Sequence, residues 1–252
     1  MSEDRKKEIR DLLSARGYMT VEELSKQLFV SVPTIRRDLN ELSRKGLVKR
    51  VHGGASYVGK DSFEWSLDLR NRVNLGEKKR IGQKAAELIE DGNHLFLDAG
   101  TTCHFLARAL KPSIKISVLT NSIPTMQKLS ENKNIIIECP CGLYVPSHLG
   151  IFGDEAASFI QTRHADFYFA TATGFHEETG VTLRTRLEIS VKQAMRKNSD
   201  CMVLLLDHSK MGIKNYYHTF DFSQIDILIT DAPLSASLAE KCADQGVDVI
   251  YA

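Results

Sequence analysis

The sequence predicts a two-part α/β protein, with a small helical unit first and a larger, mostly parallel α/β unit after it. Two observations support this division. Residues 1–57 place three amphipathic helical segments before a short glycine-containing hairpin. From residue 93 onward, short apolar runs alternate with helix-like segments, a pattern typical of a parallel sheet covered by helices. We therefore expect domains at 1–57 and 76–252, joined by a linker at 58–75 that lacks clean periodicity.

The first two helices are predicted from apolar spacing and capping residues. Ile9, Leu12 and Leu13 recur at helical spacing on a charged segment that ends near Gly17. Thr20 is placed to cap a second helix over 21–28, and the glutamate three residues later completes a capping box.

A third helix and a basic hairpin follow the turn at 29–31. Ser31 is the expected N-cap, Pro33 falls in the first turn, where a missing N–H costs nothing, and Gly46 ends the helix. The inward stripe is expected to consist of Ile35, Leu39 and Leu42. The hairpin is expected to carry Lys49, Arg50, His52, Gly53 and Gly54.

This order of helices and hairpin is typical of a winged helix-turn-helix, here with the helix-turn-helix at about 20–39 and a two-stranded wing. Arginine near a recognition-helix N-terminus can bond guanine, and hydroxyl groups there can bond phosphate or base edges. A glycine pair on the wing permits close approach to DNA. The residues expected to contact DNA are Ser31, Thr34, Arg36, Arg37, Arg50 and His52. In the alternative interpretation, the arginine pair forms a solvated surface bridged to Asp38 and Glu41.

The charge distribution favours a nucleic-acid partner for the first unit alone. The whole chain carries a formal charge of only +1. Residues 1–60, however, hold 13 lysine and arginine residues against 8 acidic residues, and the remainder holds 20 against 24. A basic head on a mildly acidic body is the asymmetry expected when a DNA-binding unit is joined to a unit with another task.

Composition excludes several other classes of protein. No apolar run approaches the roughly 20 residues that a membrane-spanning helix needs, and no signal peptide precedes the first charged helix, so we expect a cytoplasmic protein. Five scattered cysteines do not suggest a disulfide framework. Cys139 and Cys141 are the only hint of a metal site, and buried or free thiols are the preferred interpretation, so no metal or cofactor is expected.

The second unit is predicted to contain seven strands and several helices. The strand-like runs are 94–97, 116–120, 135–138, 167–170, 202–206, 225–229 and 247–250. The helix-like segments are 76–89, 102–110, 124–131, 154–161, 186–197 and 236–245.

Polar clusters follow several of these strands. Asp98 to Thr102 joins a strand to a helix N-terminus with a glycine and two hydroxyl residues, a combination suited to phosphate. Thr120-Asn121-Ser122 ends the next strand, Gly153, Gly174 and Gly180 mark later strand ends, and Asp207 to Lys210 closes another. Because ligands bind at the carboxyl ends of parallel strands, we expect these clusters to form one site for a small polar ligand. Taken singly, such a cluster is more often just a helix cap or turn.

The segment TVEELSKQLFVSVPTIRRDLNELSRKGLVKRVHGGA resembles the N-terminal signature of the DeoR family of bacterial transcription regulators. Asp98 to Thr102, Thr120 to Ser122, Gly174 to Thr182 and Asp207 to Lys210 resemble, in order, the effector domain of that family. The resemblance runs nearly from end to end. It implies a C-terminal fold of the ribose-5-phosphate isomerase type and a DNA-binding regulator, in particular a repressor of a sugar operon.

The resemblance also implies a phosphorylated sugar as effector. Gly100, Thr101, Thr102, Asn121 and Ser122 would lie near its phosphate. The rest of the site would be lined by Asp98, Lys192, Asp207 and Lys210, with Gly174 at a neighbouring strand end. The chain departs from the family at Cys141-Gly142-Leu143-Tyr144, where a Gly-Gly pair is usual.

Three further expectations concern activity and assembly. The alternative function is a sugar-phosphate isomerase with an appended DNA-binding head, using Asp98, Glu188 or Asp207 as base and Lys210 for charge; it is disfavoured because these carboxylates lie far apart in the sequence. A nicotinamide enzyme is excluded because no Gly-x-Gly-x-x-Gly follows a strand.

Operator symmetry predicts a homo-oligomer, a dimer or a tetramer, with Phe63, Trp65 and Leu69 as candidates for the contact or for interdomain packing.

Overall fold

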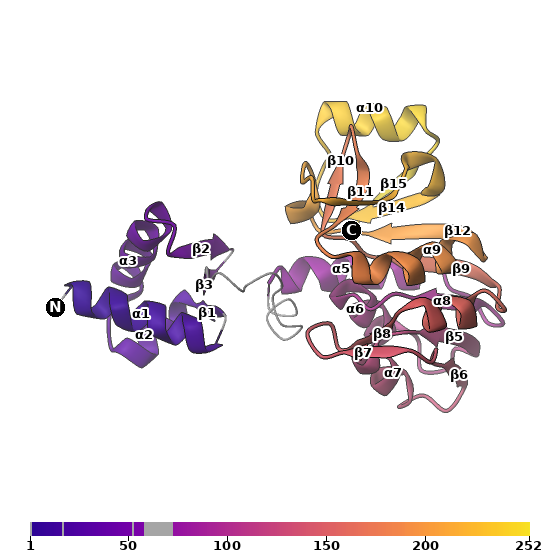
Figure 1. Cartoon of the computed structure of the whole chain (residues 1–252), viewed down its shortest axis with the longest axis horizontal. Helices are drawn as coiled ribbons and strands as arrows, with labels where there is room; N and C mark the ends of the chain where they lie inside the picture. Colours follow the sequence, from indigo (N-terminus) through magenta and orange to yellow (C-terminus); the bar gives the residue numbers. More distant parts are fainter. Residues whose placement is uncertain (1, 17, 52, 58–72) are drawn as a thin grey trace. The chain divides into compact units, whose positions relative to one another are not determined.

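The computed structural model describes residues 2–16, 18–51, 53–57 and 73–252. The chain divides into two compact units, residues 1–74 and 75–252, which are described separately (Figure 1). Most of the expected 58–75 linker and the candidates Phe63, Trp65 and Leu69 lie outside the described residues.

The N-terminal unit is a winged helix-turn-helix. Its elements are α1 (Ser2–Arg16), β1 (Tyr18–Thr20), α2 (Val21–Leu28), α3 (Val32–Arg44), β2 (Val48–Val51) and β3 (Gly54–Tyr57). The three helices and the hairpin of the sequence prediction are confirmed. The structure adds β1, which pairs antiparallel with β3 and makes the sheet three-stranded, in the order β1-β3-β2. A three-residue strand directly after a helix gives no periodicity from which to predict it.

Capping explains where the first helices begin. Thr20 accepts a hydrogen bond from the backbone N–H of Glu23, and the Glu23 carboxylate accepts one from the Thr20 N–H, so the predicted capping box is present. Ser31 is the N-cap of α3, but its hydroxyl bonds the Thr34 hydroxyl at 2.9 Å instead of a backbone N–H.

Gly46 ends the α3 turn with a φ of +69°. Ile35, Leu39 and Leu42 pack into one buried cluster with α1, α2 and the sheet, as expected.

The C-terminal unit is built on a seven-stranded sheet in which every pair of neighbours is parallel. The strands are β4 (His94–Leu97), β5 (Ile116–Thr120), β6 (Ile135–Glu138), β9 (Ala165–Ala170), β12 (Ser199–Leu205), β14 (Ile227–Thr230) and β15 (Asp248–Tyr251). Their order in the sheet is β15-β14-β12-β9-β4-β5-β6. All seven predicted strand-like runs belong to this sheet, which confirms the expected mostly parallel α/β class.

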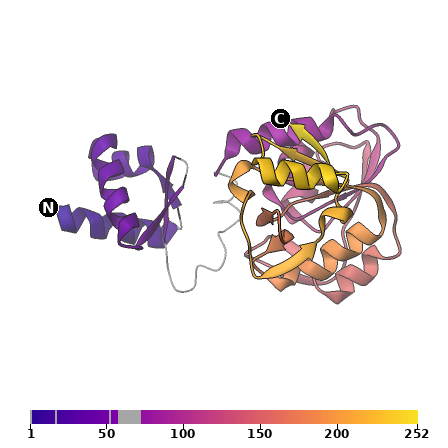
Figure 2. The ribbon, with the colours of Figure 1, turned by 90° about the horizontal axis from the view of Figure 1, so that it is seen from above.

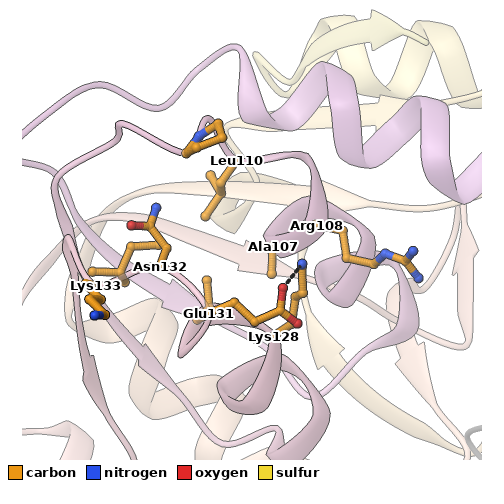
Figure 3. Close-up of a pocket in the computed structure, with 10 residues that line it drawn as sticks. Ala107, Arg108, Leu110, Lys128, Glu131, Asn132 and Lys133 are labelled. Atoms are coloured by element: carbon orange, nitrogen blue, oxygen red, sulfur yellow. Dashed lines mark hydrogen bonds and ion pairs between the residues drawn. The ribbon is translucent and has the colours of Figure 1, made fainter.

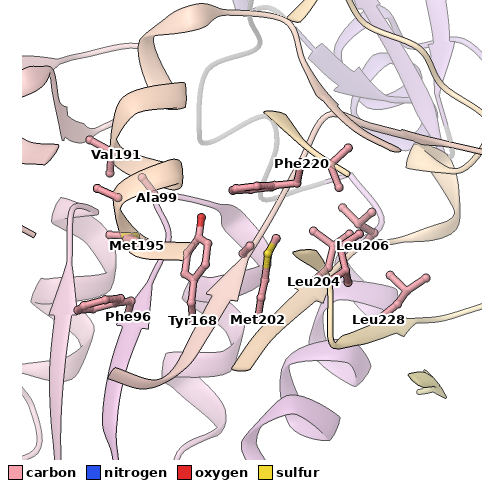
Figure 4. Packing of buried hydrophobic residues seen from close by; sticks show 14 of the residues in the cluster. Phe96, Ala99, Tyr168, Val191, Met195, Met202, Leu204, Leu206, Phe220 and Leu228 are labelled. Atoms are coloured by element: carbon pink, nitrogen blue, oxygen red, sulfur yellow. The ribbon is translucent and has the colours of Figure 1, made fainter. Parts of the chain in front are cut away.

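Helices cover both faces of this sheet (Figures 1 and 2). The helices are α5 (Leu75–Ala86), α6 (Thr101–Ala109), α7 (Ile123–Leu129), α8 (Asp154–Ile160), α9 (Ile189–Lys197) and α10 (Ala236–Asp244). Alternate strand residues point to opposite faces. Leu95 and Leu97 therefore pack with α5 and α6, whereas Phe96 packs with α8 and α9. Figure 4 shows the core on the face covered by α8 and α9, where Tyr168 of β9 lies between Phe96 of β4 and Met202 of β12.

Five short strands and three 3-10 turns were not predicted. A hairpin pairs β7 (Leu143–Val145) with β8 (Gly150–Phe152). A second antiparallel sheet joins β10 (Gly174–His176), β11 (Gly180–Leu183) and β13 (Tyr217–Phe220). The turns are η1 (Arg186–Glu188), η2 (His208–Lys210) and η3 (Phe222–Gln224). Elements of three or four residues are too short for sequence periodicity to identify.

Candidate DNA interface and effector site

The exposed face of α3 carries arginines without acidic partners. Arg36 and Arg37 are exposed, and in the part of the chain that the structure describes neither forms an ion pair. The alternative in which Asp38 and Glu41 bridge this pair is wrong. Asp38 is buried and accepts two hydrogen bonds from Arg5 of α1, at 2.5 and 3.1 Å, and Glu41 pairs with Lys6 at 2.5 Å. The acidic residues of α3 thus form ion pairs with α1. The guanidinium groups of Arg36 and Arg37 are left available to an anionic partner.

The other predicted DNA contacts lie on the same unit. Ser31 is exposed and Thr34 is half-buried at the α3 N-terminus. Arg50 lies on β2, and its Nη1 atom is buried without a hydrogen-bond partner. His52 lies outside the described residues.

The expected role of the wing glycines is wrong for Gly54. It is buried, and a Cβ there would lie 2.4 Å from the Met19 carbonyl oxygen. Its small size serves packing of β3 on β1, whereas Gly53 is exposed and turns with a φ of +76°.

In the C-terminal unit, the order of strands reverses between β4 and β9. From β4 the chain proceeds outward through β5 to β6, and it then returns to the other side of β4 to continue through β9, β12 and β14 to β15. The crevice beyond the carboxyl ends of the strands at such a switch point is where open α/β sheets bind ligands. Asp98 follows β4 and Thr171 follows β9, so both lie at this point.

Asp98 is the centre of a buried ion pair at the switch point. Its Oδ2 atom accepts hydrogen bonds from the Thr171 N–H at 3.0 Å, from the Thr171 hydroxyl at 2.7 Å and from Lys192 Nζ. The side chains of Asp98 and Lys192 are each 1% exposed. Burial opposes the charged amine, but Asp98 and Glu188 outweigh it, so the pKa of Lys192 lies above its ordinary value. Lys192 is therefore charged and bound to Asp98.

The structure corrects the argument that carboxylates lie too far apart for acid–base chemistry. Glu188 Oε2 lies 3.4 Å from Lys192 Nζ, so the fold brings Glu188 and Asp98 to the same ammonium group. Glu188 also lies 3.6 Å from His148 Nε2. Both carboxylates are buried, and each has an ionic partner.

The N-terminus of α6 lies beside this ion pair and has no side-chain cap. Gly100 is its N-cap, and a Cβ at Gly100 would lie 2.1 Å from the Thr171 hydroxyl oxygen. Only glycine fits there, so the backbone of the α6 entry runs directly against the end of β9. Thr101 and Thr102 open the helix and are both buried. Uncapped N–H groups at the positive end of a helix dipole form an anion site.

The predicted cluster at the end of β5 is tied to the β7–β8 hairpin. Asn121 Nδ2 donates to the Ile151 carbonyl at 3.1 Å, and Ile151 N–H donates to the Asn121 carbonyl at 2.8 Å. The Ser122 hydroxyl caps α7, whereas Asn121 Oδ1 is buried without a partner. The atypical segment at 141–144 leads into this hairpin, and Gly142 is confined there, because a Cβ would lie 2.6 Å from the Phe152 carbonyl oxygen.

The remaining predicted residues are divided between this edge and other sheets. Asp207 follows β12, caps η2 and bonds the Ser209 N–H at 3.0 Å, with Lys210 half-buried at the end of the turn. The expectation that every polar cluster ends a strand of one sheet is wrong: Gly174 and Gly180 begin strands of the antiparallel sheet, and Gly153 follows β8 of the hairpin. At Gly174 a Cβ would meet Asn215 Nδ2 at 2.5 Å, so that glycine serves packing. Thr171, His148 and Asp231 are polar residues of this region that the sequence did not identify.

A hollow of about 280 Å³ lies elsewhere, among Arg108, Leu110, Lys128, Glu131 and Ile135 (Figure 3). It is formed by the C-terminal ends of α6 and α7 and the start of β6, so it lies at the opposite edge of the sheet. Helix C-termini carry the negative end of the dipole and disfavour anions. Lys128 is also paired with Glu131. On this ground the hollow is a poorer candidate for an anion than the α6 N-terminus, although Arg108 and Lys133 also line it.

His208 provides a pH-dependent contact at the carboxyl edge. The hydrogen bond from His208 Nδ1 to Asp231 Oδ2, at 2.7 Å, raises the pKa of His208 against the effect of burial. The contribution of the pair to stability is therefore complete below the ordinary histidine pKa of about 6.5 and is lost as pH rises through the raised value.

We accordingly expect the difference in unfolding free energy between the wild type and Asp231→Asn to shrink as the pH rises from about 6 to about 9. Asparagine keeps an oxygen that can accept the second hydrogen bond of this pair, which the backbone N–H of His208 donates to Asp231 Oδ1 at 2.7 Å. Urea unfolding at several pH values measures the difference, and His208→Gln is the control that should remove its pH dependence. A difference that stays constant with pH would contradict this assignment.

No described helix is long and apolar enough to cross a membrane. No group of three or more histidine, cysteine, aspartate or glutamate residues in the described ranges could hold a metal ion. Cys139 and Cys141 are both free thiols.

Comparison with known proteins agrees with the division into two units. A DeoR-like helix-turn-helix domain matches residues 5–61, and a DeoR C-terminal sensor domain matches residues 73–232. The HTH-type transcriptional regulator GolR of Listeria innocua is 34% identical over 98% of this chain and 97% of its own length. The glycerol-3-phosphate regulon repressor of Escherichia coli is 32% identical over 96% of this chain and 95% of its own length.

Among solved structures, ribose 5-phosphate isomerase A from Neisseria gonorrhoeae matches with a TM-score of 0.39 and 18% identity. The match covers 53% of this chain and 52% of the isomerase. The two domain matches and the relatives aligned over nearly the whole chain establish that this protein belongs to the DeoR family of DNA-binding transcriptional regulators.

Proposed function

We propose that this regulator is a repressor of a sugar or sugar-phosphate operon that binds its operator through α3 and the wing. The observation that carries the DNA contact is the pair of exposed, unpaired arginines on α3, Arg36 and Arg37, whose acidic neighbours are bound to α1. Ser31, Thr34, Arg50 and His52 complete the proposed interface. Repression agrees with the name of the relative from Escherichia coli, a regulon repressor.

We further propose that a phosphorylated sugar binds at the switch point between β4 and β9. Its phosphate would accept hydrogen bonds from the uncapped N-terminus of α6 at Thr101 and Thr102, with Gly100, Asn121 and Ser122 beside it. Lys192 and Asp98 would hold the floor of the site as a charged pair, with Asp207 and Lys210 at its rim. Gly174 is not part of this proposal, because its surroundings are those of a packing position.

A thermal-shift screen tests the effector proposal. A ligand that binds only the native state raises the unfolding midpoint. We expect at least one phosphorylated sugar to raise the midpoint of the wild type, while the same sugar without its phosphate does not. Thr102→Val keeps the shape of the side chain and removes a hydroxyl beside the proposed phosphate, so it should shift less at equal ligand concentration. Equal shifts in the wild type and in Thr102→Val would contradict the placement of the phosphate.

The assembly is proposed to be a homo-oligomer, because one winged helix-turn-helix reads one half-site and operators are commonly symmetric. We also propose domains at 1–57 and 76–252, a linker at 58–75 and a cytoplasmic location. Crosslinking in the presence of operator should yield dimers or tetramers at micromolar protein; monomers alone would contradict it.

A second candidate function is a sugar-phosphate isomerase, which the proximity of Asp98 and Glu188 favours. Both carboxylates are buried, and both contact the Lys192 ammonium, which leaves little freedom for either to abstract a substrate proton. We propose that the protein is not an enzyme. Turnover of ribose or fructose phosphates by the purified protein would overturn that proposal.

A further inference from the structure

Phe29 combines two unfavourable features at the turn between α2 and α3. Its side chain is 95% exposed, and its backbone is left-handed, with φ +53° and ψ +40°. A non-glycine residue in this conformation is strained, and an exposed aromatic ring gains nothing from burial. Glycine or asparagine would adopt the same turn with less strain.

The turn around Phe29 is fixed on both sides, so the exposure of the ring does not come from a loose segment. The Phe29 N–H and the Val30 N–H both donate to the Ser25 carbonyl, the latter at 3.1 Å. The Ser25 hydroxyl donates to the Val30 carbonyl at 2.6 Å. Leu28 and Val30 both pack against the core of the unit, and the residue between them projects into solvent.

Phe29 lies at the end of α3 that enters the major groove first. Ser31, two residues later, is the N-cap of that helix. Further along α3, the exposed residues lie three or four positions from one another, apart from one adjacent pair, and therefore share one face: Pro33, Arg36, Arg37, Asn40 and Arg44. Phe29 comes two residues before the N-cap, so its exposed ring adds an apolar group beside the N-terminal end of α3.

The apolar group that double-stranded DNA presents in the major groove is the 5-methyl group of thymine, and phenylalanine is among the side chains that contact it. We propose that Phe29 reads a thymine methyl at the edge of the half-site and so sets sequence specificity beyond the contacts of Arg36 and Arg37. This inference rests on the proposed DNA interface of α3.

The experiment removes the ring from the protein and the methyl from the DNA. The wild type first selects duplexes from a randomised library, and each recurrent thymine in the selected duplex is then replaced by deoxyuridine, which lacks only the methyl group. Affinities are measured for the wild type, Phe29→Gly and Phe29→Asn. Tyr216→Ala, which removes a ring that is 88% exposed in the C-terminal unit, is the matched control. Urea unfolding confirms that each variant folds.

At one thymine we expect deoxyuridine to weaken wild-type binding about fourfold, the loss that corresponds to one buried methyl-sized group. The same replacement should leave Phe29→Gly and Phe29→Asn unaffected, and both variants should bind the thymine duplex several-fold more weakly than the wild type or Tyr216→Ala. Neither Phe29 variant should be less stable than the wild type.

Several results would overturn the inference while leaving DNA binding intact. One is wild-type affinity and the same selected sequence in both Phe29 variants. Another is weaker binding by the variants with no effect of deoxyuridine at any position. A third is a change of oligomeric state in the variants, measured by sedimentation, which would assign the ring to a contact between copies of the chain. If the wild type selects no sequence at all, the proposed DNA interface itself fails.

Discussion

Replacing Lys192 with alanine is expected to lower the free energy of unfolding by about 3–5 kcal/mol, the range observed when one partner of a buried ion pair is removed. Lys192 and Asp98 are each 1% exposed, and Asp98 would keep only its Thr171 and backbone partners. Its uncompensated charge at the switch point would then favour unfolding. Denaturant unfolding of the full chain, followed by circular dichroism, measures the loss.

The control for this prediction is Lys84→Ala, which breaks a surface pair with Glu87 whose side chains are 39% and 62% exposed. We expect that change to cost less than about 1 kcal/mol. The double variant Asp98→Asn with Lys192→Met should be more stable than the sum of its two single changes implies, because no unpaired charge is left buried. A Lys192→Ala variant as stable as Lys84→Ala would show that the pair is not buried as described.

Arg37→Ala is expected to weaken binding to a selected duplex by about 1–3 kcal/mol, roughly a 5- to 150-fold loss, and to relax preference at one base pair. The reason is that Arg37 is exposed on α3 and its acidic neighbour, Asp38, is bound to Arg5, so the guanidinium is free to bond a base edge. The same reasoning applies to Arg36. Fluorescence anisotropy at fixed salt measures the affinity, and repeated selection measures the preference.

Lys241→Ala makes the same change of charge in the C-terminal unit and should leave affinity unchanged. Equal affinity and specificity in Arg37→Ala and in the wild type would mean that α3 does not present this arginine to DNA.

The helices of the first unit and the central sheet of the second were predictable because their residues carry a repeating pattern. Amphipathic spacing and the Thr20–Glu23 capping box fix α2, and apolar runs mark all seven parallel strands. The hairpin β7–β8 and the sheet of β10, β11 and β13 carry no such pattern in three or four residues each, so they were missed.

The candidate sites were only partly predictable, because their key contacts join residues distant in sequence. Asp98 and Lys192 are 94 positions apart, and nothing local to either indicates that they neutralise each other. Likewise, the bond between Arg5 and Asp38 spans 33 positions and decides which charges of α3 remain unpaired. Residue chemistry at strand ends predicted a candidate site at the carboxyl edge of the sheet, whereas the assignment of polar groups to ligand or to packing required the fold.

The coupling between the effector site and the DNA interface is tested by the affinity of the protein for a selected duplex, followed by anisotropy as a phosphorylated sugar is added. We predict that a sugar phosphate that raises the unfolding midpoint also weakens DNA binding, and that Thr102→Val needs more of it for the same effect. Linkage requires the duplex, in turn, to weaken binding of that sugar phosphate by the same factor. DNA affinity that stays constant while the sugar phosphate saturates the protein would contradict the coupling of the two sites.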